Sequence, residues 1–98
     1  YHLIAPDPPT FGRGSSGQVW KIEDDLPKLL GVCNRLREPG RPFTVILSCH
    51  SPGFSCLVLE RLLEEACGRG GRFESFEMTI PESTGRELPA GVSVRYTV

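Results

Sequence analysis

One stretch of the sequence has residue types that could do chemistry, and it contains Cys49, His50, Ser51, Gly53 and Cys56. It follows an apolar run typical of a buried strand and precedes an amphipathic run typical of a helix. Ligands of open α/β sheets bind outside the carboxyl ends of strands. A helix N-terminus stabilises anions and can lower the pKa of a thiol. These five residues are therefore candidate binding residues, and the two thiols are candidate nucleophiles.

This layout resembles that of thioredoxin and glutaredoxin folds, in which a reactive cysteine lies at such a helix start. The resemblance implies a thiol domain, active or degenerate, that uses Cys49 or Cys56. The spacing departs from that family, because six residues separate the two cysteines here, where the redox motif has two. His50 is a poor general base for Cys49, because neighbouring residues of a strand point to opposite faces. The alternative is a capped turn with two packed thiols, which the spacing favours.

The other two cysteines are also predicted to be packed thiols. Cys33 and Cys67 lie inside amphipathic, helix-like stretches. Free cysteine is among the most buried residue types, so we expect reduced thiols rather than two disulfides. Because disulfides are rare in the cytosol, this favours an intracellular protein of the cytoplasm or the nucleus. The cysteine and histidine spacings match no zinc pattern, and neither a metal nor a cofactor is predicted.

A glycine-rich segment near the start matches the spacing of a phosphate-binding loop. Gly12, Gly14 and Gly17 fit G-x-G-x-x-G, but no strand-like run precedes them, and three prolines stand in its place. Glycine, serine and proline in this density are typical of a linker. We therefore expect a flexible N-terminal arm or linker over residues 1–17 and a single α+β domain over residues 18–98.

Apolar periodicity within the domain predicts four strands and two helices. The predicted elements are a strand at 18–23, a helix at 24–37, a strand at 43–49, a helix from Ser51 or Ser55 to Cys67, and strands at 72–80 and 92–98. The order β-α-β-α-β-β predicts a small α+β sandwich in two layers. The alternative is a three-layer, thioredoxin-like arrangement with one helix on each face.

Composition narrows the function classes. The chain has 98 residues and a formal net charge of −1, which argues against a free-standing nucleic-acid binder. No apolar run approaches the roughly 20 residues of a membrane helix, so no membrane partner is expected. No catalytic set is evident either. We therefore expect a non-catalytic interaction domain cut from a larger protein, not an enzyme, with a protein partner or the rest of the parent chain as its ligand and no small-molecule ligand.

The docking surface is expected on the last strand. Val92, Val94 and Tyr96 alternate with polar residues, which is typical of an edge strand that can accept a further strand. Trp20 is a second candidate, because exposed aromatic residues often anchor interfaces. An RNA-facing α+β domain is a further alternative, although the neutral charge disfavours it.

Overall fold

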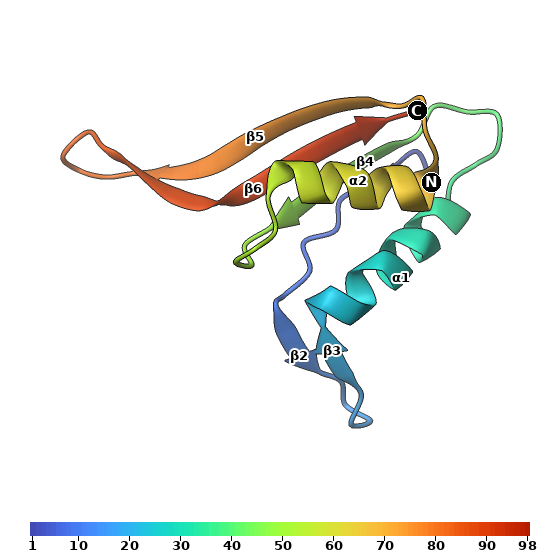
Figure 1. Cartoon of the computed structure of the whole chain (residues 1–98), viewed down its shortest axis with the longest axis horizontal. Helices are drawn as coiled ribbons and strands as arrows, with labels where there is room; N and C mark the ends of the chain where they lie inside the picture. Colours follow the sequence, from blue (N-terminus) through green and yellow to red (C-terminus); the bar gives the residue numbers. More distant parts are fainter.

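A computed structural model of the chain describes residues 1–98. A mixed sheet of four strands forms one layer, with the order β1-β4-β6-β5, and β1 is parallel to β4 whereas the other neighbours are antiparallel (Figure 1). A hairpin of two further strands, β2 and β3, lies apart from this sheet. The strands are β1 (Leu3–Ile4), β2 (Phe11–Arg13), β3 (Val19–Lys21), β4 (Thr44–Cys49), β5 (Arg72–Pro81) and β6 (Glu87–Thr97).

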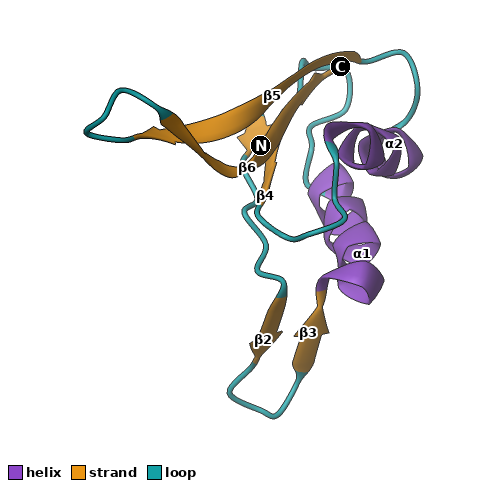
Figure 2. Ribbon diagram, turned by 60° about the vertical axis from the view of Figure 1, so that its left-hand side comes forward, coloured by secondary structure: helices purple, strands orange, loops and turns teal.

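Both helices, α1 (Ile22–Arg35) and α2 (Cys56–Cys67), lie on the same side of the sheet (Figure 2). Along β4 burial alternates, and its fully buried side chains pack with those of both helices in one core. The other face of the sheet has no helix, so the two-layer α+β sandwich is confirmed and the three-layer alternative is not found. The core residues of the helices and of β4 are Ile22, Leu26, Leu30, Leu59, Leu63, Cys67, Val45, Leu47 and Cys49.

Local sequence explains where the helices begin and end. The Ser55 hydroxyl accepts a hydrogen bond from the Val58 N–H, so the later of the two predicted starts of α2 is the observed one. Gly68 ends α2 with a φ of 100°, a conformation that favours glycine. Helix α1 begins earlier than predicted, at Ile22, and the Asp25 carboxylate accepts from the Lys21 N–H. Neither helix is long and apolar enough to cross a membrane.

The order β-α-β-α-β-β is found from β3 to β6, but the sequence misplaced two elements. The strand β3 was expected in the main sheet and instead pairs with β2. The parallel neighbour of β4 is β1, in the segment where no strand was predicted. All four cysteines are free, as expected, although Cys56 is only half-buried.

The hairpin of β5 and β6 is longer than predicted and extends past the helix layer (Figure 1). Residues 81–91 were expected to form a loop because of their glycines and prolines. In the structure the ladder continues to the pair Pro81–Glu87, so only a short turn remains. Pro89 is accommodated where the ladder is irregular, because a proline lacks the N–H that a regular pair would use.

Candidate functional site at the carboxyl ends of β1 and β4

Two parallel strands end side by side at one edge of the sheet. Ile4 of β1 lies opposite Val45 of β4, and the pairing continues past β1, where the Ser48 N–H donates to the Pro6 carbonyl oxygen at 3.1 Å. The residues that follow each strand therefore meet at this edge. Ligands of open α/β sheets bind at such carboxyl ends, which makes this edge the first place to look for a site.

Asp7 follows β1 on a backbone that is held at several points. Pro8 is buried, the Pro9 carbonyl oxygen accepts from Trp20 Nε1 at 2.7 Å, and the Thr10 carbonyl oxygen accepts from the Ile22 N–H at 3.2 Å. The prolines also fix φ at their own positions, which removes backbone freedom. The Asp7 carboxylate is therefore carried on a rigid segment, although its side chain remains 64% exposed.

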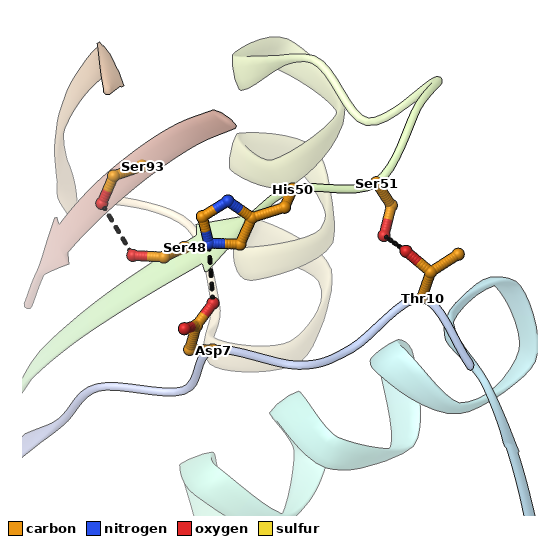
Figure 3. Close-up of polar contacts among 6 residues, drawn as sticks. All are labelled: Asp7, Thr10, Ser48, His50, Ser51 and Ser93. Carbon is orange, nitrogen blue, oxygen red and sulfur yellow. Dashed lines mark hydrogen bonds and ion pairs between the residues drawn. The ribbon is translucent and has the colours of Figure 1, made fainter. Parts of the chain in front are cut away.

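His50, the residue after β4, reaches across to Asp7. Its Nε2 lies 3.3 Å from Asp7 Oδ1, and both side chains are more than half exposed (Figure 3). The other side of the ring lies against Gly91 of β6, where a Cβ atom would come within 2.8 Å of His50 Nδ1. The imidazole thus bridges the carboxyl ends of β1 and β4 and packs on the strand beyond.

Two hydroxyl pairs flank this contact. Thr10 Oγ1 and Ser51 Oγ lie 2.6 Å apart, and Ser51 is 7% exposed (Figure 3). Ser48 Oγ and Ser93 Oγ lie 3.3 Å apart on the helix-free face of the sheet. The first pair fixes the turn after β4 against the segment after β1. The second adds polar groups to the sheet beside His50.

This arrangement can bind a cation or accept a proton. A carboxylate offers several acceptor positions, and the contact with His50 occupies one oxygen of Asp7. Exposed ion pairs contribute little net stability, so a ligand can displace or extend this contact at small cost. The site is thus chemically suited to a group that carries an N–H, an O–H or a positive charge.

The structure separates the residues that were predicted for this turn. Cys49 is 1% exposed and faces the helices, whereas His50 points to the other face, so the two do not form a thiol–base pair. Cys56 is the first residue of α2, and Gly53 occupies the turn with a φ of 85°. Only His50 and Ser51 of the predicted set take part in the polar contacts.

The predicted docking strand is not an edge. Over Val92–Thr97, β6 lies between β4 and β5, so this part of the strand is paired on both sides and no strand can add to it. Val94 and Tyr96 are fully buried, and Val92 packs against the core. Trp20 is half-buried in β3 and its indole holds the Pro9 carbonyl.

Sequence reasoning missed Asp7, Thr10, Ser48 and Ser93. The prolines around Asp7 dominated the interpretation of residues 1–17, although the apolar pair of β1 lies shortly before them. A short apolar pair with an acidic residue three positions later was the only signal. Ser48 and Ser93 lie inside strands and carry no local pattern that marks a site.

A hollow lies at the C-terminal end of α2. It has a volume of about 550 Å³ and is lined by charged residues and one glycine: Arg61, Glu64, Glu65, Gly68 and Arg69. Both charge signs are present in equal number and no apolar wall is available. It lacks the mostly apolar lining of a small-molecule site, so the edge at β1 and β4 remains the candidate.

Comparison with solved structures finds this fold in methyltransferases. The chain matches the SAM dependent methyltransferase from Agrobacterium tumefaciens over 98% of its own length, with a TM-score of 0.83 and 32% sequence identity. It covers 33% of that chain, so it spans about a third of the length of this neighbour. No protein-family model and no curated protein matches the sequence.

A second solved structure shares the fold at lower sequence identity. This is SMU.776, which is assigned as a methyltransferase and was solved in complex with SAH. The match covers 99% of this chain and 26% of that chain, with a TM-score of 0.64 and 18% identity. At this identity the likeness shows the fold alone.

These comparisons correct two expectations from the sequence. A non-catalytic interaction domain was expected, yet two solved structures that match nearly the whole chain are described as methyltransferases. The expectation that the protein is not an enzyme is wrong for the same reason. The absence of a recognisable catalytic set misled the interpretation, because a chain that spans a third of its neighbour need not carry a whole site.

Proposed function

We propose that this chain forms part of the catalytic domain of a SAM-dependent methyltransferase. The observation that carries the proposal is the match to the Agrobacterium tumefaciens enzyme, which includes 98% of the chain at 32% identity. A shared fold does not by itself imply a shared activity, so the proposal also needs a site. The polar edge at the carboxyl ends of β1 and β4 provides a candidate for that site. This replaces the expectation of no small-molecule ligand.

The side chains at this edge fit SAM as a ligand. SAM carries a positively charged sulfur and has no phosphate, so it needs a carboxylate nearby rather than a phosphate loop. Asp7 provides an exposed carboxylate. Gly12, Gly14 and Gly17 lie in and between β2 and β3, not between a strand and a helix, and are not needed for such a ligand. We infer that SAM, the methyl donor, and the methyl acceptor bind near Asp7 and His50.

SAM, when bound, supplies a methyl group to a nucleophilic atom of the acceptor. In this chain, the Asp7 carboxylate accepts a hydrogen bond from an acceptor N–H or O–H and takes up the proton that this group loses. His50 Nε2 contacts Asp7 Oδ1 and leaves Oδ2 available for the acceptor. The hydrogen bonds to the Pro9 and Thr10 carbonyls keep the carboxylate in place.

The remaining parts of the cofactor site come from the rest of the parent protein in this proposal. The chain spans about a third of the Agrobacterium tumefaciens enzyme, and β1 has a neighbour on one side only. The expected partner, the rest of the parent chain, is therefore retained as part of the proposal.

The test uses the full-length protein that contains this chain. Calorimetry measures the binding of SAM and of SAH, and transfer of tritiated methyl groups from SAM is measured on total RNA and total protein of the source cells. Asp7→Asn should lower the transfer rate by about 10²-fold, the contribution typical of a positioned acid or base, and should also weaken SAM binding, because the positively charged sulfur loses its nearby carboxylate. Asp24→Asn, an exposed carboxylate of α1, is the matched control.

Each result has a definite meaning. A folded full-length protein that binds neither SAM nor SAH contradicts the proposed function. Binding and transfer that persist unchanged in Asp7→Asn keep the function and remove the role of Asp7. Equal losses in Asp7→Asn and Asp24→Asn indicate a general effect of charge rather than a site.

A further inference from the structure

The hairpin of β5 and β6 carries an exposed apolar stripe, which we define as Phe76, Met78, Ile80 and Leu88. Phe76, Ile80 and Leu88 are 53%, 57% and 45% exposed, and Ile80 lies directly opposite Leu88. Between the pairs Glu77–Val92 and Thr79–Pro89, the extra residue is on β6. β5 therefore alternates regularly, and its three stripe residues share the helix-free face.

The helices do not cover this stripe. The hairpin extends beyond the helix layer, and α1 and α2 both lie on the opposite side of the sheet (Figures 1 and 2). Exposed apolar patches on a hairpin are associated with interaction surfaces. The stripe begins beside the candidate site, because Met78 Cε and His50 Nδ1 both border the position where Gly91 would carry a Cβ atom.

Two ion pairs bracket the stripe. Arg95 Nη2 lies 2.5 Å from Glu74 Oε2 at the base of the hairpin, and Arg86 Nε lies 2.9 Å from Glu82 Oε2 at its tip. Each pair bridges the two strands, and alternation along β5 puts Glu74 and Glu82 on the same face as the stripe. This face thus has an apolar centre with an ion pair at each end, and Arg72 lies beyond the pair at the base.

We propose that this face binds a second copy of the same protein, related by a two-fold axis that runs along the hairpin. Such an axis puts β5 of one copy over β6 of the other, tip on tip and base on base. Two sheets that pack face to face prefer this near-aligned arrangement. Ile80 then faces the partner's Leu88, and Leu88 faces the partner's Ile80, as an isologous interface requires.

The charges agree with this occupant. With β5 over β6, Glu82 faces the partner's Arg86 and Glu74 faces the partner's Arg95, so each ion pair is extended by its opposite on the other copy. A nucleic acid is disfavoured, because the two arginines that bracket the stripe, Arg86 and Arg95, are each already paired with a glutamate. The stripe and its ends are therefore complementary to themselves.

The first experiment measures the oligomeric state of the full-length protein by sedimentation equilibrium. Ile80→Lys should raise the dimer dissociation constant by at least about tenfold, because it puts a charge into the apolar centre. Thr79→Lys is the matched control: Thr79 is exposed, lies one residue away and points to the other face. Circular dichroism confirms that both variants are folded, and equal effects of the two substitutions would overturn the proposal.

The second experiment exchanges charges at the tip. Glu82→Arg or Arg86→Glu alone puts like charges opposite each other and should weaken self-association by about threefold, as exposed pairs do. A mixture of the two variants should restore it, because Arg at position 82 then faces Glu at position 86. A mixture with no preference for the heterodimer contradicts the two-fold arrangement.

Other occupants give different results. A full-length protein that is monomeric at every concentration, with Met78 protected from oxidation, has the stripe covered by another part of the same chain. If the full-length protein is monomeric and Met78 is freely oxidised, nothing covers the stripe. Either result overturns the proposal, and neither bears on SAM binding, so the proposed function is tested separately.

Discussion

His50 Nε2 lies 3.3 Å from Asp7 Oδ1, and this contact joins the ends of two parallel strands that are far apart in the sequence. The two residues come from segments of opposite character, one rich in proline and one that follows the most apolar strand. Their meeting depends on the pairing of β1 with β4. A substitution that loosens the segment after β1 should therefore disturb the contact between Asp7 and His50 before it disturbs the packing of the core.

The hydroxyl pair of Thr10 and Ser51 should stabilise the fold measurably. Ser51→Ala removes a partner at 2.6 Å from a residue that is 7% exposed, and we expect a loss of about 1 kcal/mol. In a double-mutant cycle with Thr10→Val, measured by urea denaturation, the coupling should be about 0.5–1.5 kcal/mol. Additive losses would show that the two hydroxyls do not interact.

Gly91 should tolerate no side chain. Its φ is 104°, and a Cβ atom would lie 2.6 Å from the Cys49 carbonyl oxygen and 2.8 Å from His50 Nδ1. Gly85 has a similar φ of 89° but nothing within 4 Å, so it is the matched control. Both alanine variants should lose about 1 kcal/mol for the strained φ, and Gly91→Ala should lose about 1–3 kcal/mol more.

The two glycine variants are compared by thermal unfolding. A domain of this size changes its melting temperature by about 4–8 °C per kcal/mol, so the extra loss in Gly91→Ala is easily resolved. Equal melting temperatures would mean that His50 and the Cys49 carbonyl can move away from this position. In that case His50 would not be held against β6.

The sequence predicted best what depends on local pattern. The apolar periodicity of α2 specified its buried face, and the end of α2 followed from Gly68. The apolar run of β4 indicated a strand at the centre of the sheet, where the structure places it. These features are visible locally because period and capping are properties of neighbouring residues. The order of the elements predicted the α+β class, and the alternation of the last two strands favoured the two-layer form over the three-layer one.

Strand pairing could not be predicted in the same way. β1 has two residues and is stabilised by its parallel contact with β4, far along the chain, so nothing local distinguishes it from a linker. The alternation of apolar and polar residues in β6 indicated one solvent-exposed face, from which an edge strand was predicted. A central strand of a sheet with one open face alternates in the same way. The candidate site was missed because Asp7 depends on the first of these pairings.

The core should be sensitive to truncation on one side of α2 only. Leu59 is fully buried against the sheet, and Leu59→Ala should lower the free energy of unfolding by about 2–5 kcal/mol. Leu57, two residues earlier, is 58% exposed, and Leu57→Ala should change it by less than about 0.5 kcal/mol. Urea denaturation of both variants checks this, and similar losses would contradict the observed orientation of α2.

Stability should fall in alkaline solution because of three buried acids. Burial raises the pKa of Cys33 and of Cys67 above the ordinary value of 9.0, and for Cys67 the neighbouring Cys33 adds to this while Arg37 opposes it. Burial likewise raises the pKa of Tyr96 above 10.0. The unfolded chain therefore loses these protons at lower pH than the folded chain. Stability is fully present below pH 9 and is lost as the pH rises through the folded pKa values.

The measurement is urea denaturation at a series of pH values from about 8 to about 10.5, a range that includes the unperturbed pKa values of cysteine and tyrosine. Each group whose protonation differs between the two states contributes a slope of at most about −1.4 kcal/mol per pH unit. Cys67→Ala lowers the stability at every pH, because it leaves a small cavity, but it should make the alkaline slope shallower. A variant with the same slope as the unchanged protein would show that Cys67 titrates alike in the folded and unfolded chains.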